Sequence, residues 1–171
     1  MDLEITINGV PYETSKGIIL QTFNGTNIPN YQKTMLIQSD ENFAKLSEHK
    51  YDTKFRPDHP TAMYNCHGLT FACRRTGIFD DHVVESILKE EYREIKERKD
   101  VQSGDIVVYR DTGVILHSAL VVYIETMPHN IKVLSKDVKY KEIEHYVDRS
   151  PFNHGEKKFY RINHAVTKII S

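Results

Sequence analysis

The spacing of hydrophobic residues predicts two helices in the middle of the chain. From Cys66 to Arg75, apolar or small residues recur at i, i+3 and i+4, and Gly77 follows as a typical helix end. A clearer helix is expected over residues 81–99, because pairs of Glu with Lys or Arg at i,i+4 line its outer side. The inner side of that helix carries four apolar residues: Val84, Ile87, Leu88 and Ile95.

After residue 101 the pattern changes to alternating and β-branched residues, which favour strands. Strands are expected over residues 105–109, 116–125, 131–138 and 158–162. Near the N-terminus, the alternation of residues 3–7 followed by Asn8-Gly9 predicts a β-hairpin. Helices followed by an antiparallel sheet indicate the α+β class, and 171 residues without a repeat or linker indicate one domain, 1–171.

The composition is that of an ordinary globular protein with no bulk preference for nucleic acid. Hydrophobic residues make up 39%, charged residues make up 27% and the net charge is −1, so no basic binding stripe is expected. No apolar run approaches the about 20 residues of a membrane span, and residues 1–7 lack the features of a signal peptide. We therefore expect no membrane association and a cytoplasmic location, with export by a route that reads no cleaved signal left open.

The chain has two cysteines, and their settings differ. If both lie on one helix, Cys66 and Cys73 are about 10 Å apart along its axis, too far for a disulfide. Cys73 is interpreted as a small buried hydrophobic residue. Cys66 opens the predicted helix, where unpaired N–H groups and the positive end of the helix dipole favour a thiolate. Cys66 is therefore the candidate nucleophile.

His117 is the candidate general base for Cys66. It stands near the start of a β-branched strand that follows the Gly104-Asp105 strand. If that strand packs beside the helix of Cys66, the imidazole can reach the thiol. A third polar group usually orients such an imidazole, and Asp137 on the next strand is the preferred candidate. The reserves for this role are Ser135, Asn130 and Glu125.

Residues next to Cys66 are candidates for binding the substrate or the oxyanion. Tyr64 could donate a hydrogen bond to a tetrahedral intermediate, or it could cover the edge of the core. Asn65 suits a helix N-cap, and Gly68 leaves room near the sulfur. The Cys66 N–H is a candidate oxyanion donor. The expected oxyanion or substrate-binding set is Tyr64, Asn65, His67, Gly68 and Ser135.

Three motifs resemble those of the NlpC-type and CHAP-type papain-fold cysteine peptidases and amidases. They are Asn65-Cys66-His67-Gly68, Gly104-Asp105-Ile106-Val107 and His117-Ser118-Ala119-Leu120-Val121. The resemblance spans residues 60–140 and implies a papain-like core, about residues 60–165, in which N-terminal helices with the nucleophile at a helix start pack on an antiparallel sheet. His67 stands where that superfamily usually has a small serine, and residues 1–55 align with nothing in it, so they form an unassigned N-terminal elaboration.

The same resemblance implies an activity and a class of substrate. Cys66 would be the nucleophile and His117 the base, and no cofactor is expected. The substrate would be a peptide or amide bond, in peptidoglycan peptides or in a protein target during bacterial conflict. We therefore predict a cysteine hydrolase that works through an acyl-enzyme.

Two other functions fit parts of the sequence. A papain-like domain without activity would serve as a binding, immunity or adaptor protein with a protein partner. The presence of both Cys66 and His117 argues against this alternative. Alkylation of Cys66 at mildly acidic pH would indicate a hydrolase, whereas an inert thiol would indicate an adaptor. A zinc site is suggested by nine histidines and by Cys66-His67 with Cys73, but no CxxC or HExxH spacing occurs. We therefore predict no metal.

Overall fold

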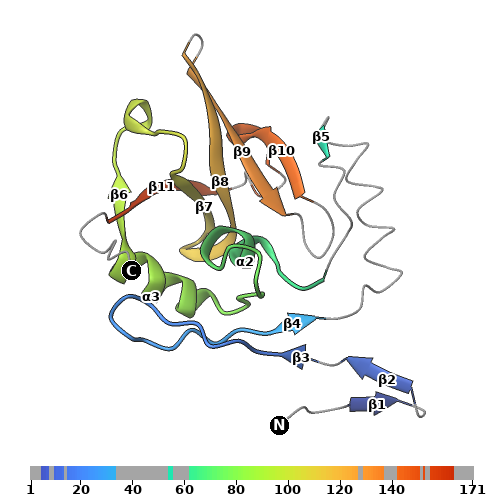
Figure 1. Cartoon of the computed structure of the whole chain (residues 1–171). Coiled ribbons are helices and arrows are strands. Elements are labelled where there is room, and N and C mark those ends of the chain that lie inside the picture. The colour runs from blue at the N-terminus through green and yellow to red at the C-terminus, as the bar shows by residue number, and fades with distance from the viewer. Residues whose placement is uncertain are drawn as a thin grey trace, which may run out of the picture.

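Seven antiparallel strands form the main sheet of the computed structural model (Figure 1). Their order across the sheet is β5-β10-β9-β8-β7-β11-β6. The bounds are β5 Lys54–Phe55, β6 Tyr92–Ile95, β7 Ile106–Asp111, β8 Val114–Thr126, β9 His129–Lys136, β10 Glu142–Tyr146 and β11 Glu156–Ile162. The structure describes residues 5–7, 10–13, 15–33, 54–55, 62–126, 129–136, 142–150, 152 and 155–163.

Most strands lie where alternation and β-branching predicted them. β7, β8, β9 and β11 match the four predicted segments with small shifts at their ends, and residues 137–138 of the third segment lie outside the described residues. The predicted N-terminal hairpin is confirmed by β1 (Ile5–Ile7) pairing with β2 (Val10–Glu13). A further ladder joins β3 (Ser15–Lys16) to β4 (Gln32–Lys33). The sequence interpretation missed β10, which brings Glu142 into the sheet beside β9.

Two α-helices pack on one face of the main sheet, as Figure 1 shows. They are α2 (Cys66–Phe71), which contacts β8 and β9, and α3 (Asp81–Glu91), which contacts β6 and β8. Short 3-10 turns follow at η1 (Arg98–Asp100) and η2 (Val147–Arg149). The arrangement confirms the α+β class.

Both helices are shorter than predicted. The first ends at Phe71 because Cys73 and Arg74 adopt left-handed backbone conformations, with φ of 49° and 67°. Cys73 is exposed there, so the prediction that it is buried is wrong.

The second helix ends at Glu91 rather than at residue 99. Tyr92–Ile95 forms β6 instead and pairs with β11 along the sheet edge. The i,i+4 pattern of residues 94–98 is compatible with a helix, but an i,i+4 pair stabilises a helix by only about 0.2–0.5 kcal/mol. Strand pairing and the packing of Tyr92 against the core outweigh that preference.

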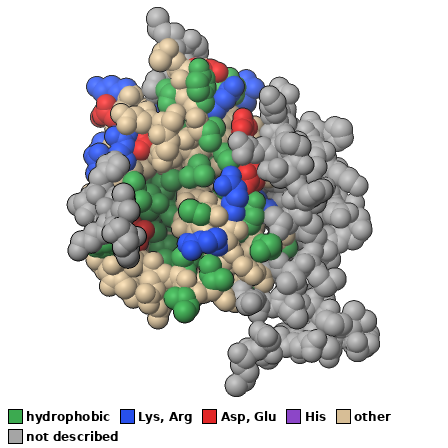
Figure 2. Space-filling model, in the orientation of Figure 1, with side chains coloured by type: hydrophobic (Ala, Val, Ile, Leu, Met, Phe, Trp, Pro, Cys, Tyr) green, Lys and Arg blue, Asp and Glu red, His purple; other side chains and the backbone are tan. Residues whose placement is uncertain are grey.

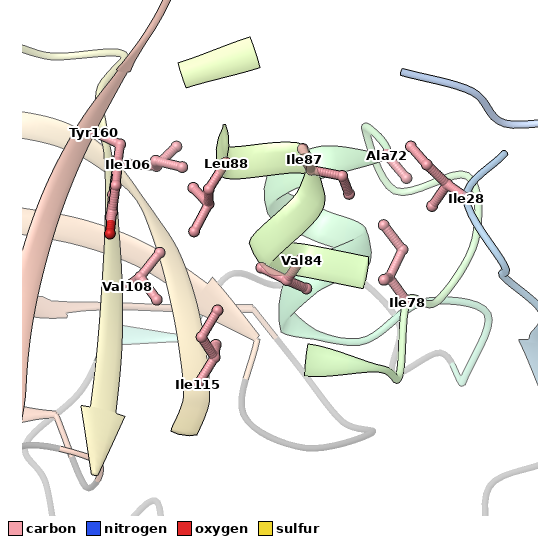
Figure 3. Close-up of a cluster of buried hydrophobic side chains, with 10 residues drawn as sticks. All are labelled: Ile28, Ala72, Ile78, Val84, Ile87, Leu88, Ile106, Val108, Ile115 and Tyr160. Atoms are coloured by element: carbon pink, nitrogen blue, oxygen red, sulfur yellow. The ribbon is translucent and has the colours of Figure 1, made fainter. Parts of the chain in front are cut away.

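The sheet separates two hydrophobic layers. Ile106 and Val108 of β7 face the helices, whereas Val107 and Tyr109 face the opposite side. Figure 3 shows the helix-side layer, in which the apolar face of α3 packs towards β7. Each large aliphatic side chain buried here stabilises the fold by roughly 1.5–3 kcal/mol. The alternation along each strand therefore decides which layer a side chain enters.

The surface formed by the described residues carries both charged and apolar side chains. Among the described residues, no helix has the length and apolar character needed to cross a membrane. On the face seen in Figure 2, Lys and Arg side chains are distributed among Asp, Glu and a central group of hydrophobic side chains. The described residues on this face thus form no single basic patch.

Candidate functional site

The start of α2 positions Cys66 through its neighbour Asn65. The Asn65 side chain is the N-cap: its Oδ1 accepts from Gly68 N at 2.9 Å and from Ile78 N at 3.1 Å, and its Nδ2 donates to Ile78 O at 2.6 Å. This amide therefore ties the helix start to the following loop. Cys66 is the first helical residue, and it is half-buried.

Gly68 serves packing rather than substrate access. A Cβ at this position would lie 1.9 Å from the carbonyl oxygen of Thr76, so only glycine lets the helix approach that backbone. The space predicted beside the sulfur is thus occupied by Thr76, which is buried.

The Gly104-Asp105 motif also has a structural role. Gly104 adopts φ +94°, and the Asp105 carboxylate accepts the backbone N–H of Gln102 at 2.6 Å. The same carboxylate forms a two-point contact with Arg161 at 2.7 and 2.8 Å. These contacts fix the turn into β7 and tie it to β11.

A polar cluster centred on the buried Lys136 and Glu142 side chains lies near the start of α2. We call it the Cys66 cluster, and it consists of Tyr64, Cys66, Arg74, Lys136 and Glu142. Lys136 lies opposite Glu142 where β9 pairs with β10, and neither residue is exposed beyond 3%. The Tyr64 hydroxyl donates to Glu142 Oε1 at 2.8 Å, and Arg74 donates to both carboxylate oxygens, with the Nη2–Oε2 distance at 3.0 Å. Sequence patterns gave no signal for Arg74, Lys136 or Glu142.

Lys136 is the electrostatic centre of this cluster. Its Nζ lies 4.6 Å from the centroid of the Tyr64 ring. Burial lowers the pKa of Lys136 to about 8, while the negative charges of Glu142 and of Cys66 act in the opposite direction. Because charge interactions are mutual, the ammonium stabilises a thiolate at Cys66. The dipole of a six-residue helix adds less than a full charge.

Tyr64 is a hydrogen-bond donor within the cluster. Burial, followed by the hydrogen bond to Glu142, raises the pKa of Tyr64 to about 12. The phenol therefore stays neutral at physiological pH and donates to the carboxylate. This role differs from the predicted contact with a reaction intermediate.

The structure does not bring His117 to Cys66. The Ser118 hydroxyl donates to Thr70 Oγ1 at 3.0 Å and meets His67 Nδ1 at 2.8 Å, so Ser118 faces α2. Successive residues of a strand point to opposite faces, and His117 accordingly enters the other layer. There its ring stacks on Phe152 with the centroids 4.4 Å apart. The predicted Cys66–His117 pair is therefore not formed.

His67, which follows Cys66 in the chain, has a structural role. His67 is buried between α2 and the sheet, and burial lowers its pKa to about 4 against the opposing charge of Asp81. Its hydrogen bond to Ser118 couples the helix to β8. His67 is thus neutral at pH 7 and joins two elements of the fold.

The predicted orienting residues that the structure describes, Ser135, Asn130 and Glu125, have partners away from Cys66. Ser135 Oγ is 3.0 Å from His145 Nε2, on the sheet face opposite Lys136. Asn130 donates to Glu125 at 3.1 Å near the far end of the β8–β9 hairpin. Asp137 lies outside the described residues. Within the described ranges, no group of three or more His, Cys, Asp or Glu residues is arranged to hold a metal ion.

Three buried histidines should lower the unfolding free energy of the protein in acid. Burial lowers the pKa of His67 to about 4, lowers that of His117 well below its usual value, and lowers that of His145. Below about pH 6.5 the unfolded chain binds these protons more readily than the folded protein does. Each histidine should then reduce the unfolding free energy by up to about 1.4 kcal/mol per pH unit, and for His67 the loss should end near the folded pKa of about 4.

Urea unfolding at about pH 7.5 and at about pH 5 measures this loss. The variant His67→Gln should flatten the pH dependence, whereas His82→Gln, at an exposed site on α3, should not. Equal unfolding free energies of the wild type at the two pH values would contradict the prediction.

The searches against known proteins match no protein-family model, no curated protein and no solved structure. The functional argument below therefore depends on the geometry around Cys66.

Proposed function

We propose that the chain is a cysteine hydrolase that cleaves a peptide or amide bond through Cys66. The observation that carries this proposal is the setting of the thiol: Cys66 is half-buried at the start of α2, two residues after Tyr64, whose ring centroid lies 4.6 Å from the Nζ of the buried Lys136. A neighbouring cation favours the thiolate, which is the nucleophilic form of cysteine. Cysteines at inert core positions lack such a cation.

The proposed reaction is acyl transfer. The thiolate attacks the amide carbonyl, and the Cys66 N–H is the proposed donor to the oxyanion. The carbon–nitrogen bond then breaks, the leaving amine takes up a proton, and an acyl-enzyme remains on Cys66. Water hydrolyses that thioester and restores the thiol.

The proposal includes a papain-like core related to the NlpC-type and CHAP-type hydrolases. In its support, a helix that begins at a cysteine packs on the antiparallel strands β8 and β9. The Gly104-Asp105 strand, β7, lies beside β8 as the motif order requires. The departure is at His117, whose ring belongs to the opposite layer.

Acylation with the activated ester p-nitrophenyl acetate tests the proposal. At about pH 6.5, an ordinary thiol is about 1% ionised, so only an activated cysteine should react quickly. We expect intact-mass and peptide-mapping measurements to find one acetyl group on Cys66, followed by its loss through hydrolysis. Exposed Cys73 is the internal reference, and a Cys73→Ser variant should keep the Cys66 reaction. Acetylation of Cys66 no faster than that of Cys73 would refute the proposal.

A second candidate function is a catalytically silent papain-like binding domain. The specific observation in its favour is the complete burial of the His117 ring against Phe152 and Tyr109, away from α2. The acetylation experiment separates the two functions, because a binding domain needs no activated thiol. A binding domain would also tolerate Cys66→Ala without loss of its partner.

A further inference from the structure

Residues 17–31 form an arm that joins β3 to β4 and runs alongside α3 (Figure 1). The sequence interpretation assigned no role to this part of the chain. The tip of the arm is fixed to the last turn of α3, because the hydroxyls of Thr22 and Thr26 donate to the Glu90 carboxylate at 2.6 and 2.9 Å. The arm is therefore tied to a helix at its far end.

Asn30, near the C-terminal end of the arm, uses every hydrogen-bonding position of its side-chain amide. Nδ2 donates to the carbonyl oxygens of Ile18 and Ile28 at 2.9 and 2.8 Å, and Oδ1 accepts from Ile18 N at 3.0 Å. Oδ1 also accepts from the Thr76 hydroxyl at 2.8 Å. An amide side chain has two donor hydrogens and two acceptor lone pairs, so all of them are occupied. Asn30 thus joins the two sides of the arm and links them to the loop between α2 and α3.

Two further contacts connect the arm to this loop. Tyr31 and Gly77 exchange two backbone hydrogen bonds, at 3.0 and 3.1 Å. The Ile28 side chain belongs to the same buried cluster as Ala72 and Ile78, and Figure 3 shows these residues together. The loop is therefore packed against the arm through backbone and side chains.

Thr76 lies between the arm and the start of α2. Its hydroxyl donates to Asn30, and its carbonyl oxygen is so close to Gly68 that a Cβ on Gly68 would be 1.9 Å away. Thr76 has no exposed surface. Ile78, two residues further on, bonds through its N–H and C=O to the Asn65 side chain, which also accepts Gly68 N. Direct contacts therefore lead from the arm to the first turn of α2.

The first turn of α2 needs such support. The helix has six residues, and isolated helices shorter than about 12 residues are marginal in water. Its shape therefore depends on contacts from outside the helix.

We infer that Asn30 is a positioning residue for Cys66 and that the arm braces the start of α2. Asn30 holds the loop through Thr76, the loop holds the Asn65 side chain through Ile78, and Asn65 caps the helix that begins at Cys66. The effect on catalysis rests on the proposed function, whereas the link between the arm and the helix does not.

Hydrogen exchange of single backbone amides tests the link without a substrate. Thr76→Val keeps the shape of the side chain and removes the hydroxyl that Asn30 accepts. The N–H groups of Gly68 and Ile78, which both donate to Asn65, should then exchange about three- to tenfold faster. Asn30→Ala should accelerate them at least as much, and the double variant should add nothing to Asn30→Ala.

Two control variants separate this link from a general loss of stability. Ile131→Val leaves a small cavity in the opposite hydrophobic layer and lowers global stability without touching the loop. Asn27→Ala removes an exposed amide of the same arm, which accepts from Gln21 at 2.8 Å. Neither should change exchange at Gly68 and Ile78. The inference is wrong if Thr76→Val leaves these two amides unchanged, or accelerates them no more than Ile131→Val does. If Asn30→Ala does not fold, Thr76→Val gives the result alone.

Acetylation of Cys66 by p-nitrophenyl acetate, read by peptide mapping, is the second measurement. A displacement of about 1 Å in a reacting group can lower a rate about 10²-fold, so folded Thr76→Val should acetylate about threefold more slowly or less. Ile131→Val and Asn27→Ala should keep the wild-type rate. Faster exchange with an unchanged acetylation rate would overturn the positioning of Cys66. If wild-type Cys66 takes up no acetyl group, the proposed function fails, while exchange at Gly68 and Ile78 still shows whether the arm braces the helix.

Discussion

Cys66→Ala is expected to abolish hydrolysis, with a loss of about 10³-fold or more in turnover. Without the sulfur, the proposed thioester acyl-enzyme cannot form. The measurement is single-turnover acetylation with p-nitrophenyl acetate, followed by release of acetate, for the wild type and the variant. Cys66→Ser tests the same point, since a hydroxyl beside Lys136 remains a far weaker nucleophile.

The fold should survive this change. Cys66 is half-buried, and the removal of its sulfur should alter the unfolding free energy by no more than about 1 kcal/mol. Cys73→Ala is the control, because it removes an exposed thiol a short distance along the chain. Undiminished turnover in folded Cys66→Ala would exclude Cys66 as the nucleophile.

Glu142→Gln is expected to destabilise the protein by about 3 kcal/mol. The Glu142 side chain is only 2% exposed, and it accepts from both Arg74 and Tyr64. The amide keeps the shape but removes the negative charge, which leaves Lys136 buried beside a second cation. Breaking one partner of a buried ion pair is costly because the other charge stays uncompensated. Urea unfolding near neutral pH measures the loss.

Glu125→Gln provides a matched control for this prediction. Glu125 also accepts from a tyrosine, with Tyr146 Oη at 2.8 Å, and it also lies near a lysine, Lys132 at 3.7 Å. Water reaches this second group, so the same substitution there should leave the urea midpoint nearly unchanged. Equal effects of the two substitutions would show that burial of the Cys66 cluster does not strengthen its ion pairs.

The secondary structure was predictable where local signals agree. β-branched runs indicated β7 and β8, and Asn65 before Cys66 indicated the start of a helix. The end of α3 was not predictable, because residues 92–95 join a sheet edge formed with β11, which lies more than sixty residues further along the chain. Local propensity is weak compared with that pairing.

The candidate site was predictable only in part. Cys66 stood out because its position depends on a local helix start. His117 was expected beside Cys66 but enters the other layer, because a strand presents every second residue to the same face and a shift by one residue exchanges the faces. Ser118 rather than His117 meets α2, and Lys136 and Glu142 come from strands whose pairing is not visible in local sequence.

The local pattern of residues in the sequence was sufficient to place a cysteine at a helix start and to define the α+β class. Those features depend on contacts between residues close in sequence. Pairing across the sheet decided that the Lys136 side chain lies against Tyr64 before α2 and that the His117 ring enters the opposite layer, because strand register sets the face of each side chain. The chemistry available to Cys66 is therefore a property of the assembled sheet.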